Sequence, residues 1–508
     1  MQLSKKNLKN IIAQPGLTIP DETLLSLPEK VLQFGTGVLL RGLPDYFIDK
    51  ANRQGVFNGR VVIVKSTSQG GTDAFGKQDG LFTLCVKGIE DGEKVEETII
   101  NSSISRVLSA SDEWKAILTC AHNPEMQIVI SNTTEVGITL VDDNIQSAPP
   151  VSFPGKLLAF LYERFKAFKG SEESGMVVIP TELIMDNGTK LRSIVLELAK
   201  MNKLEDTFIN WVNTANHFCN SLVDRIVPGK LPENDKLETE KELGYTDDLM
   251  IMSECFRLWA IESDSERVKQ VLSFSQVDDG VVIAPSIEKF RELKLRLLNG
   301  THTFSCGVAY LSGFTTVKEA MASAIFASFI NDLSLQEIST AISGSTIKYE
   351  EACTFAPKVI DRFRNPFLDH QWLSISVQFS SKMKMRNVPI LLKHYEKSKQ
   401  VPENMALGFA CFLLFMKTKK TGDNKYEGHA NGKNYTVQDD NVAYFAEHWQ
   451  SKTVNEVVDA VLADKNFWDA DLSALPGFAE AVKTNLNLLV DKGVAKAVAD
   501  HQLNKTEA

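Results

Sequence analysis

The sequence predicts an α/β first domain followed by a mainly helical second domain. Through the first half of the chain, continuous β-branched runs such as residues 60–65 and 176–180 alternate with helical patterns. Buried parallel strands have this composition. Beyond about residue 300, strand-like runs become rare and apolar residues recur at helical spacing over long stretches. A chain of 508 residues can form two separate cores.

The composition argues against a nucleic-acid-binding protein and against a membrane protein. The 55 basic and 65 acidic residues give a net charge of −10 without any basic block, so we expect neither nucleic acid nor an anionic membrane as a partner. The longest apolar run, residues 405–416, suits a buried helix rather than a membrane span. The seven cysteines are scattered singly, which predicts reduced thiols and a cytoplasmic protein.

The first strand and helix predict a nucleotide-binding site. Residues 31–34 read as a short strand that runs into the turn Gly35-Thr36-Gly37, and the helix after it starts near residues 40–42 because Pro44 fits only a first turn. Residues 60–65 form the next strand. A strand, glycine turn, helix and strand make the βαβ unit of a Rossmann-like dinucleotide-binding domain, where glycines allow a pyrophosphate to approach the helix N-terminus. The predicted cofactor contacts are Phe34, Gly35, Thr36, Gly37, Val38, Leu39, Leu40, Arg41 and Lys65.

This turn matches the Gly-x-Gly-x-x-Gly motif of dinucleotide-binding folds only in part. Leu40 stands at the third glycine position, and Lys65 replaces the acidic residue expected at the end of the second strand. A lysine would tolerate a 2′-phosphate, so the sequence leaves the choice between NAD and NADP open.

The remaining elements of the first domain follow in order. We expect strands at 81–86, 126–131 and 176–180, helices at 112–120, 151–168, 190–201 and 207–222, and a charged surface excursion at 228–242. Polar residues just past the carboxyl end of a strand lie where open α/β sheets bind ligands. Glu135 is such a residue, although it also fits a helix-cap role.

The second domain is expected to consist mainly of helices. They are predicted at 317–333, 388–398, 404–416, 454–463 and 477–498, with a polar loop at 422–433. We place the dinucleotide-binding domain at residues 1–275 and the helical substrate domain at 276–508.

The most informative stretch, residues 294–302 with the sequence KLRLLNGTH, lies near this join. On an α-helix at about 100° per residue, Lys294, Asn299 and His302 share one side with two leucines. A lysine pressed against apolar neighbours can approach a useful base, and a cleft between domains is a favoured ligand site. The spacing alone also fits surface charges beside a hydrogen-bonded core histidine.

This run resembles the signature of the polyol-specific long-chain dehydrogenases, the mannitol dehydrogenase family. Further matches are Arg41 after the glycine turn and the runs SNTTE at 131–135, LVDRI at 222–226, RFRNP at 362–366 and FWDADL at 467–472. The resemblance implies a metal-independent, nicotinamide-linked interconversion of an alcohol and a ketone. Lys294 would be the general acid/base, Asn299 would stabilise the oxyanion, and His302 would position the substrate. His302 and Cys306 alone are too few ligands for a zinc site.

Within the family, three runs resemble the branch that reduces the keto acid D-tagaturonate to D-altronate in hexuronate breakdown: AHNPEM at 121–126, SNTTEVG at 131–137 and ELGY at 242–245. A small sugar acid is then the expected ligand. The implied substrate contacts are Glu135, Glu182, Asn187, Asp224 and Lys382.

The basic residues near Lys382 bear on the substrate. The mannitol branch carries a substrate-binding arginine where this chain has Ser374, whereas Lys382 remains and is joined by Lys384 and Arg386. Basic groups at the site would suit a carboxylate, although Lys384 and Arg386 also fit plain solvation. A fructuronate reductase, a mannitol-type polyol dehydrogenase and, more remotely, a dinucleotide-binding regulator without turnover stay as alternatives.

Overall fold

The computed structural model describes residues 1–66, 71–134 and 136–506. The chain forms two compact units. Unit 1 holds Met1–Gly88 and Lys94–Ile287, and unit 2 holds Ile89–Glu93 and Glu288–Ala508. Unit 1 contains a parallel sheet flanked by helices and unit 2 is mainly helical, so the predicted fold class is confirmed.

The main sheet of unit 1 has six strands in the order β6-β3-β2-β7-β8-β9, and every neighbouring pair is parallel. The strands are β2 Glu29–Phe34, β3 Arg60–Lys65, β6 Ile104–Ser109, β7 Ile128–Ser131, β8 Val177–Pro180 and β9 His217–Phe218. The chain order runs outward from β2 to β6 and then reverses from β7 to β9. Ligands of doubly wound sheets bind at the carboxyl ends of the strands where this order reverses, here between β2 and β7.

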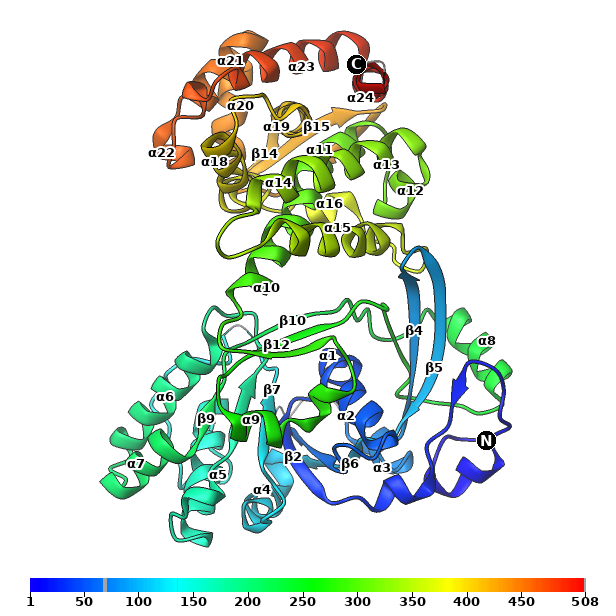
Figure 1. The fold of residues 1–508 in the computed structure, drawn as a ribbon, viewed down its shortest axis with the longest axis vertical. Helices are drawn as coiled ribbons and strands as arrows, with labels where there is room; N and C mark the ends of the chain where they lie inside the picture. The colour runs from blue at the N-terminus through cyan, green and yellow to red at the C-terminus, as the bar shows by residue number, and fades with distance from the viewer. Residues whose placement is uncertain (67–70, 135, 507–508) are drawn as a thin grey trace. The chain divides into compact units, whose positions relative to one another are not determined.

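Successive residues of the central strands face opposite sides of the sheet, as the two-residue period requires. Val31 packs in a core with Phe47 of α2, whereas Leu32 packs in a second core with Trp114 of α4 and Leu157 of α5. Figure 1 shows α5, α6 and α7 grouped together. These helices are α1 Val38–Gly42, α2 Pro44–Arg53, α4 Ala110–Thr119, α5 Phe153–Ala167, α6 Asn187–Met201 and α7 Asp206–Ala215.

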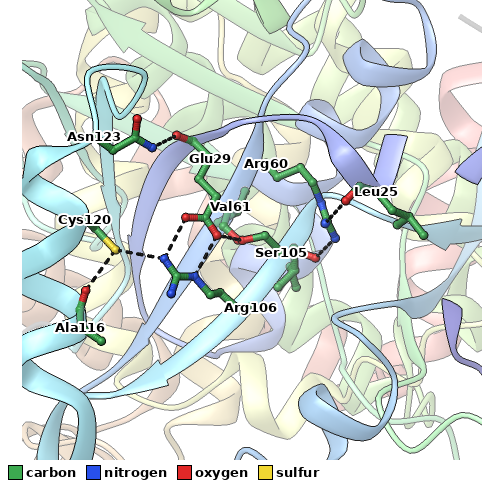
Figure 2. Close-up of polar contacts among 10 residues, drawn as sticks. Leu25, Glu29, Arg60, Val61, Ser105, Arg106, Ala116, Cys120 and Asn123 are labelled. Carbon is green, nitrogen blue, oxygen red and sulfur yellow. Dashed lines mark hydrogen bonds and ion pairs between the residues drawn. The ribbon is translucent and has the colours of Figure 1, made fainter. Parts of the chain in front are cut away.

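A polar cluster ties together the amino ends of β2, β3 and β6 (Figure 2). Glu29 accepts hydrogen bonds from Nε and Nη2 of Arg106, both at 2.9 Å. The buried Arg60 donates to the carbonyl oxygens of Leu25 at 2.7 Å and Ser102 at 3.2 Å. These side chains are therefore hydrogen-bonded within the protein at the amino ends of the strands, at the edge of the sheet opposite the carboxyl ends.

Two smaller sheets complete unit 1, although residues 89–93 at one end of the first of them belong to unit 2. One has the order β1-β5-β4-β11 and the other the order β10-β12-β13. Their strands are β1 Leu17–Thr18, β4 Phe82–Glu90, β5 Glu93–Asn101, β11 Ile251–Ser253, β10 Ser221–Asp224, β12 Leu258–Glu262 and β13 Val281–Ala284, and the remaining α-helices are α3 Asp73–Lys77, α8 Glu233–Leu243 and α9 Glu266–Val271.

One prediction in unit 1 is wrong and another gains detail. The helix expected at 207–222 ends at Ala215, because Asn216 is extended (φ −105°, ψ 142°) and its side chain bonds the Met176 N–H and the Trp211 carbonyl. The apolar residues that prolonged the helical pattern belong to β9 and β10. The segment expected as a charged surface excursion at 228–242 does lie on the surface, and most of it forms the charged helix α8.

Unit 2 is built around the contact of α11 with α19. Glycines let the two helices approach closely, since a Cβ added to Gly307 would lie 2.9 Å from the carbonyl carbon of Cys411, and one added to Gly408 would lie 2.9 Å from the carbonyl oxygen of Phe304. The helices are α10 Glu288–Leu293, α11 Thr301–Leu311, α12 Val317–Ala322, α13 Ala324–Asn331, α14 Ser339–Ile342, α15 Tyr349–Arg364, α16 Trp372–Ile375, α17 Phe379–Lys382, α18 Val388–Lys397, α19 Glu403–Phe415, α20 Val442–Ser451, α21 Val454–Leu462, α22 Lys465–Trp468, α23 Phe478–Lys492 and α24 Val494–Thr506, together with the π-helices η6 Lys294–Gly300, η7 Asp332–Ile338 and η8 Met383–Asn387.

Unit 2 also contains a small antiparallel sheet where the sequence predicts a polar loop. Strands β14 Lys419–Gly422, β15 Lys425–Ala430 and β16 Lys433–Thr436 pair in that order. The loop prediction at 422–433 is therefore wrong. Among the residues that the structure describes, no helix is both long and apolar enough to cross a bilayer.

Candidate functional site

In unit 1 the glycine turn connects β2 to α1 at the carboxyl edge of the sheet. Gly35 has φ +129°, and a Cβ there would lie 3.0 Å from the carbonyl oxygen of Asn132, so the turn and its close packing both require glycine. Gly37 is exposed, and a Cβ on it would meet no heavy atom within 4 Å. The backbone at Gly37 is therefore open to a ligand, as a dinucleotide pyrophosphate needs.

Glu182, just past the end of β8, holds the segment that follows β7. Its Oε1 accepts hydrogen bonds from the N–H of Thr133 at 2.8 Å and from Oγ1 of Thr133 at 2.9 Å, and its Oε2 accepts one from Oγ of Ser131 at 3.1 Å. The Asn132 amide donates to Oγ1 of Thr181 at 3.0 Å. The predicted polar edge is thus a connected network beside the glycine turn. Glu135 lies outside the described residues.

Asn187 makes no side-chain atom available to a substrate. It is fully buried, and its Nδ2 donates to the carbonyl oxygens of Pro180, Glu182 and Ser221 at 3.0 to 3.1 Å. Its Oδ1 accepts from the N–H groups of Gly188 and Ser221, both at 2.9 Å. This corrects the expectation of a substrate contact, because an amide with both atoms satisfied inside the protein is a structural group.

Three further charged residues that were predicted for the site in unit 1 are also buried. Nη1 of Arg41 donates to the Leu249 carbonyl at 2.6 Å, and its guanidinium lies over the rings of Phe75 and Phe82. This side chain is directed into the protein and is therefore not one of the proposed cofactor contacts. Lys65 ends β3 and Asp224 ends β10, and both are less than 10% exposed.

In unit 2, residues Lys294–Gly300 form the π-helix η6, which continues into α11 at Thr301. The α-helical wheel drawn from the sequence therefore does not apply to this stretch, since a π-helix has i→i+5 hydrogen bonds and a wider turn. Lys294 and Asn299 are half-buried. The side-chain amide of Asn299 makes no hydrogen bond within residues 1–66, 71–134 and 136–506.

His302 is buried among aromatic rings of unit 2. Its ring stacks on Phe363 with centroids 4.0 Å apart and an interplanar angle of 12°, and it meets His370 edge-on at 5.2 Å. Neither ring nitrogen bonds any residue that the structure describes. Burial lowers the pKa of His302 well below its usual value, and the charges of His370, Arg362, Arg386 and Lys382 lower it further. The imidazole is neutral at pH 7 and can either donate or accept a hydrogen bond.

The side chains that lower the pKa of His302 form a basic cluster, which we define as Arg362, His370, Lys382 and Arg386. Arg362 lies on α15, Lys382 ends α17, and Arg386 lies in η8. Burial lowers the pKa of Lys382, and Arg386 lowers it further, because each charge disfavours the other. Nζ of Lys382 donates to the Ile375 carbonyl at 2.8 Å.

The structure therefore places residues around His302 that the sequence reading did not assign to the site. Arg362 and His370 were not among the predicted site residues, and Arg386 fitted solvation as well as binding. One signal was available for Arg386, since it follows Lys382 by four residues and helical residues at that spacing are neighbours. Nothing in the spacing connects Arg362 with His302, because they are joined only by the fold.

Both units match models of a single protein family. The model of the mannitol dehydrogenase Rossmann domain matches residues 29–273, and that of the mannitol dehydrogenase C-terminal domain matches residues 286–490. An altronate oxidoreductase of Bacillus subtilis is 37% identical over 93% of this chain and 95% of its own length. One of Shigella flexneri is 36% identical over 93% of this chain and 96% of its own length.

Two solved structures share the fold. Pseudomonas fluorescens mannitol 2-dehydrogenase, described as a ternary complex with NAD and D-mannitol, superimposes with a TM-score of 0.66 at 24% identity, covering 99% of this chain and 100% of its own. A substrate-free D-sorbitol dehydrogenase superimposes with a TM-score of 0.79 at 19% identity, covering 98% of this chain and 100% of its own. The resemblance inferred from the sequence is confirmed, and the chain belongs to the mannitol dehydrogenase family.

Proposed function

We propose that this protein is an NAD-dependent oxidoreductase that reduces the ketone of D-tagaturonate to the alcohol of D-altronate, reversibly. Its similarity to altronate oxidoreductases extends over 93% of the chain. The observation that carries the choice of a sugar acid is the basic cluster around His302. A substrate with a carboxylate would neutralise this cluster, and a neutral ketose would not.

Unit 1 would hold the cofactor. The residues of the turn fit a dinucleotide, because Gly35 supplies the positive φ and Gly37 leaves its backbone open. The proposed contacts are Phe34, Gly35, Thr36, Gly37, Val38, Leu39, Leu40 and Lys65. When bound, the nicotinamide supplies or accepts the hydride. Lys65 at the end of β3 makes NADP the alternative to be tested beside NAD.

Unit 2 would supply the proton chemistry. In the reductive direction Lys294 would donate a proton to the oxygen of the former ketone, and in the oxidative direction it would remove that proton. The Asn299 amide would donate a hydrogen bond to the oxygen as negative charge develops on it. The neutral His302, held against the ring of Phe363, would fix the substrate by a hydrogen bond.

The remaining predicted substrate residues have different proposed roles. Lys382 would approach the sugar acid directly, since its ammonium lies in the basic cluster. Glu182 would act by positioning residues 131–133, and Asp224 and Glu135 stay as proposed contacts. We propose the cytoplasm as the compartment, because the seven cysteines are free thiols.

A steady-state comparison tests this function. The purified protein is assayed for NADH oxidation with D-tagaturonate, D-fructuronate and D-fructose, and then with NADPH in place of NADH. We expect the highest kcat/KM with D-tagaturonate and NADH. Turnover of D-tagaturonate no better than that of D-fructose would contradict the proposal, and a preference for D-fructuronate would make the protein a fructuronate reductase. Tight NADH binding without oxidation by any of the three ketones would favour a regulator.

A further inference from the structure

Arg386 carries a positive charge that the described part of the chain does not neutralise. Its Nη1 donates to Oγ1 of Thr303 at 3.3 Å, and the described residues offer its guanidinium no other hydrogen-bond acceptor. The side chain is half-buried, and burial lowers its pKa without any opposing carboxylate. A guanidinium has five N–H donors, so most of its donors are available to a ligand.

The backbone that carries Arg386 is fixed to the helix of the proposed catalytic residues. Nη1 of Arg296 in η6 donates to the carbonyl oxygens of Met385 at 2.7 Å and of Arg386 at 3.0 Å. Nδ2 of Asn387 donates to the Gly300 carbonyl at 3.3 Å. Each π-helix therefore bonds the other, and the position of Arg386 relative to residues 294–300 is set before any substrate binds.

Thr303 links the guanidinium to the same helix. Its Oγ1 donates to the Asn299 carbonyl at 2.8 Å while it accepts from Arg386. Thr303 follows His302 directly, and the charge of Arg386 is one of those that lower the pKa of His302. The guanidinium thus lies close to the groups that are proposed to hold the substrate.

The two other basic side chains of this segment are used differently. Lys384 forms an ion pair with Asp469 at 2.9 Å, and Lys382 donates to the Ile375 carbonyl at 2.8 Å. Arg386 is consequently the best placed of the three to bind a planar anion by donating two parallel hydrogen bonds to it.

We propose that Arg386 is a specificity-determining residue that binds the substrate carboxylate through its guanidinium. This inference rests on the proposed function, because it needs a keto acid as the substrate. It assigns the discrimination between sugar acids and neutral ketoses to one guanidinium held by η8 and Thr303. Lys382 adds charge nearby, whereas Arg386 adds the directional contact.

Substitution of Arg386 tests this. The variant Arg386→Gln keeps a donor for Thr303 and removes the charge. We expect its KM for D-tagaturonate to rise roughly 30-fold, as for the loss of a hydrogen bond to a charged group, with a smaller change in kcat. The variant Arg386→Lys keeps the charge but loses the two parallel N–H donors of the guanidinium, so its KM should rise less than that of Arg386→Gln. The control Lys384→Gln makes the same change of charge two residues away and should leave KM close to the wild-type value.

The readouts separate this inference from the proposed function. Thermal unfolding and NADH titration of each variant verify that the protein is folded, and the full-length protein is used throughout. A KM for D-tagaturonate that does not change in folded Arg386→Gln, or that rises equally in Lys384→Gln, overturns the inference. A wild-type protein that does not oxidise NADH with D-tagaturonate overturns the proposed function instead.

A comparison of inhibitors needs no variant. D-altronate and D-altritol differ only in a carboxylate against a hydroxymethyl group, and each is tested as an inhibitor of NADH oxidation by the wild-type protein. We expect D-altronate to bind at least roughly tenfold more tightly. Equal inhibition constants would show that no group of the site recognises the carboxylate, and would overturn the role of Arg386.

Discussion

Lys294 is the residue on which the proposed proton transfer depends. We predict that Lys294→Ala lowers kcat by about 10²- to 10⁴-fold, the usual contribution of a general acid or base. The dissociation constant of NADH should hardly change, because the glycine turn belongs to unit 1 and Lys294 to unit 2. Steady-state NADH oxidation and fluorescence titration measure the two quantities. Turnover that survives in Lys294→Ala would refute the assignment.

Lys382 should contribute charge rather than chemistry. Its ammonium is one of the groups that lower the pKa of His302, so its loss weakens the attraction for an anion. We predict that Lys382→Ala raises KM for a keto acid about tenfold and raises KM for a neutral ketose much less. The ratio of the two KM values is the measurement. Equal increases would mean that Lys382 does not act on the carboxylate.

At the scale of single residues, the sequence could not show which of the predicted side chains are already bonded within the protein. His302 was singled out from its spacing and family pattern, and the structure stacks its ring on Phe363 with neither ring nitrogen bonded to a described residue. Asn187 was expected to face the substrate, yet five hydrogen bonds hold its amide inside unit 1. A sequence shows that an amide is present, but only the fold decides whether main-chain groups already satisfy it.

Among the elements, the crossing of α11 with α19 depends on small residues. A Cβ on Gly307 would lie 2.9 Å from the backbone of Cys411, which cannot move independently of α19. We predict that Gly307→Ala lowers the free energy of unfolding by about 1–3 kcal/mol through overpacking. The control Gly344→Ala places a methyl where no heavy atom lies within 4 Å. Urea unfolding of both variants is the measurement, and equal stabilities would contradict the packing argument.

Helix α2 buries a carboxyl that gives unit 1 a dependence on pH. Burial raises the pKa of Asp45 to about 7, whereas Gln33 and Arg41 oppose this rise. Because the folded pKa lies above the value of 3.8 for an ordinary aspartate, the contribution of Asp45 to stability is complete below that value. It is lost as the pH rises through about 7.

The variant Asp45→Asn should remove this dependence, since an amide does not ionise. We predict that it is more stable than the wild-type protein at about pH 8, by at most about 4 kcal/mol, and that the advantage shrinks at about pH 5. Urea unfolding at the two values measures the difference. An advantage of the same size at both would contradict a titrating Asp45.

The predictions of helices and strands succeeded where the element is buried on one face or on all sides. Strand β3 has the predicted bounds of 60–65 because all six residues are buried in the sheet. The sheet β14–β16 was missed because most residues of its strands are exposed or half-buried, which leaves no apolar alternation to read. The helix expected at 477–498 divides into α23 and α24 at Gly493, whose φ of +81° ends the first helix. The π-helical turn of η6 has no sequence signature of this kind.

At the scale of the whole molecule, the order of helices and strands along the chain predicted more of the structure than the composition did. The alternation of strands and helices through the first half predicted a Rossmann-like α/β domain. The structure adds the strand order, which places the glycine turn where that order reverses. The net charge of −10 gave no hint of the basic cluster in unit 2. Its basic side chains come from three separate stretches of unit 2, namely Arg362, His370 and the neighbouring pair Lys382 and Arg386, so the fold has to bring these stretches together.

The central claim is that this protein transfers a hydride to the ketone of a sugar acid. The most direct measurement is the reaction of D-tagaturonate with NADH that carries deuterium on the transferred position, followed by NMR analysis of the product. The account predicts D-altronate with one deuterium on the carbon of the former ketone. Recovery of unlabelled D-tagaturonate, or of the epimeric acid in place of D-altronate, would contradict it.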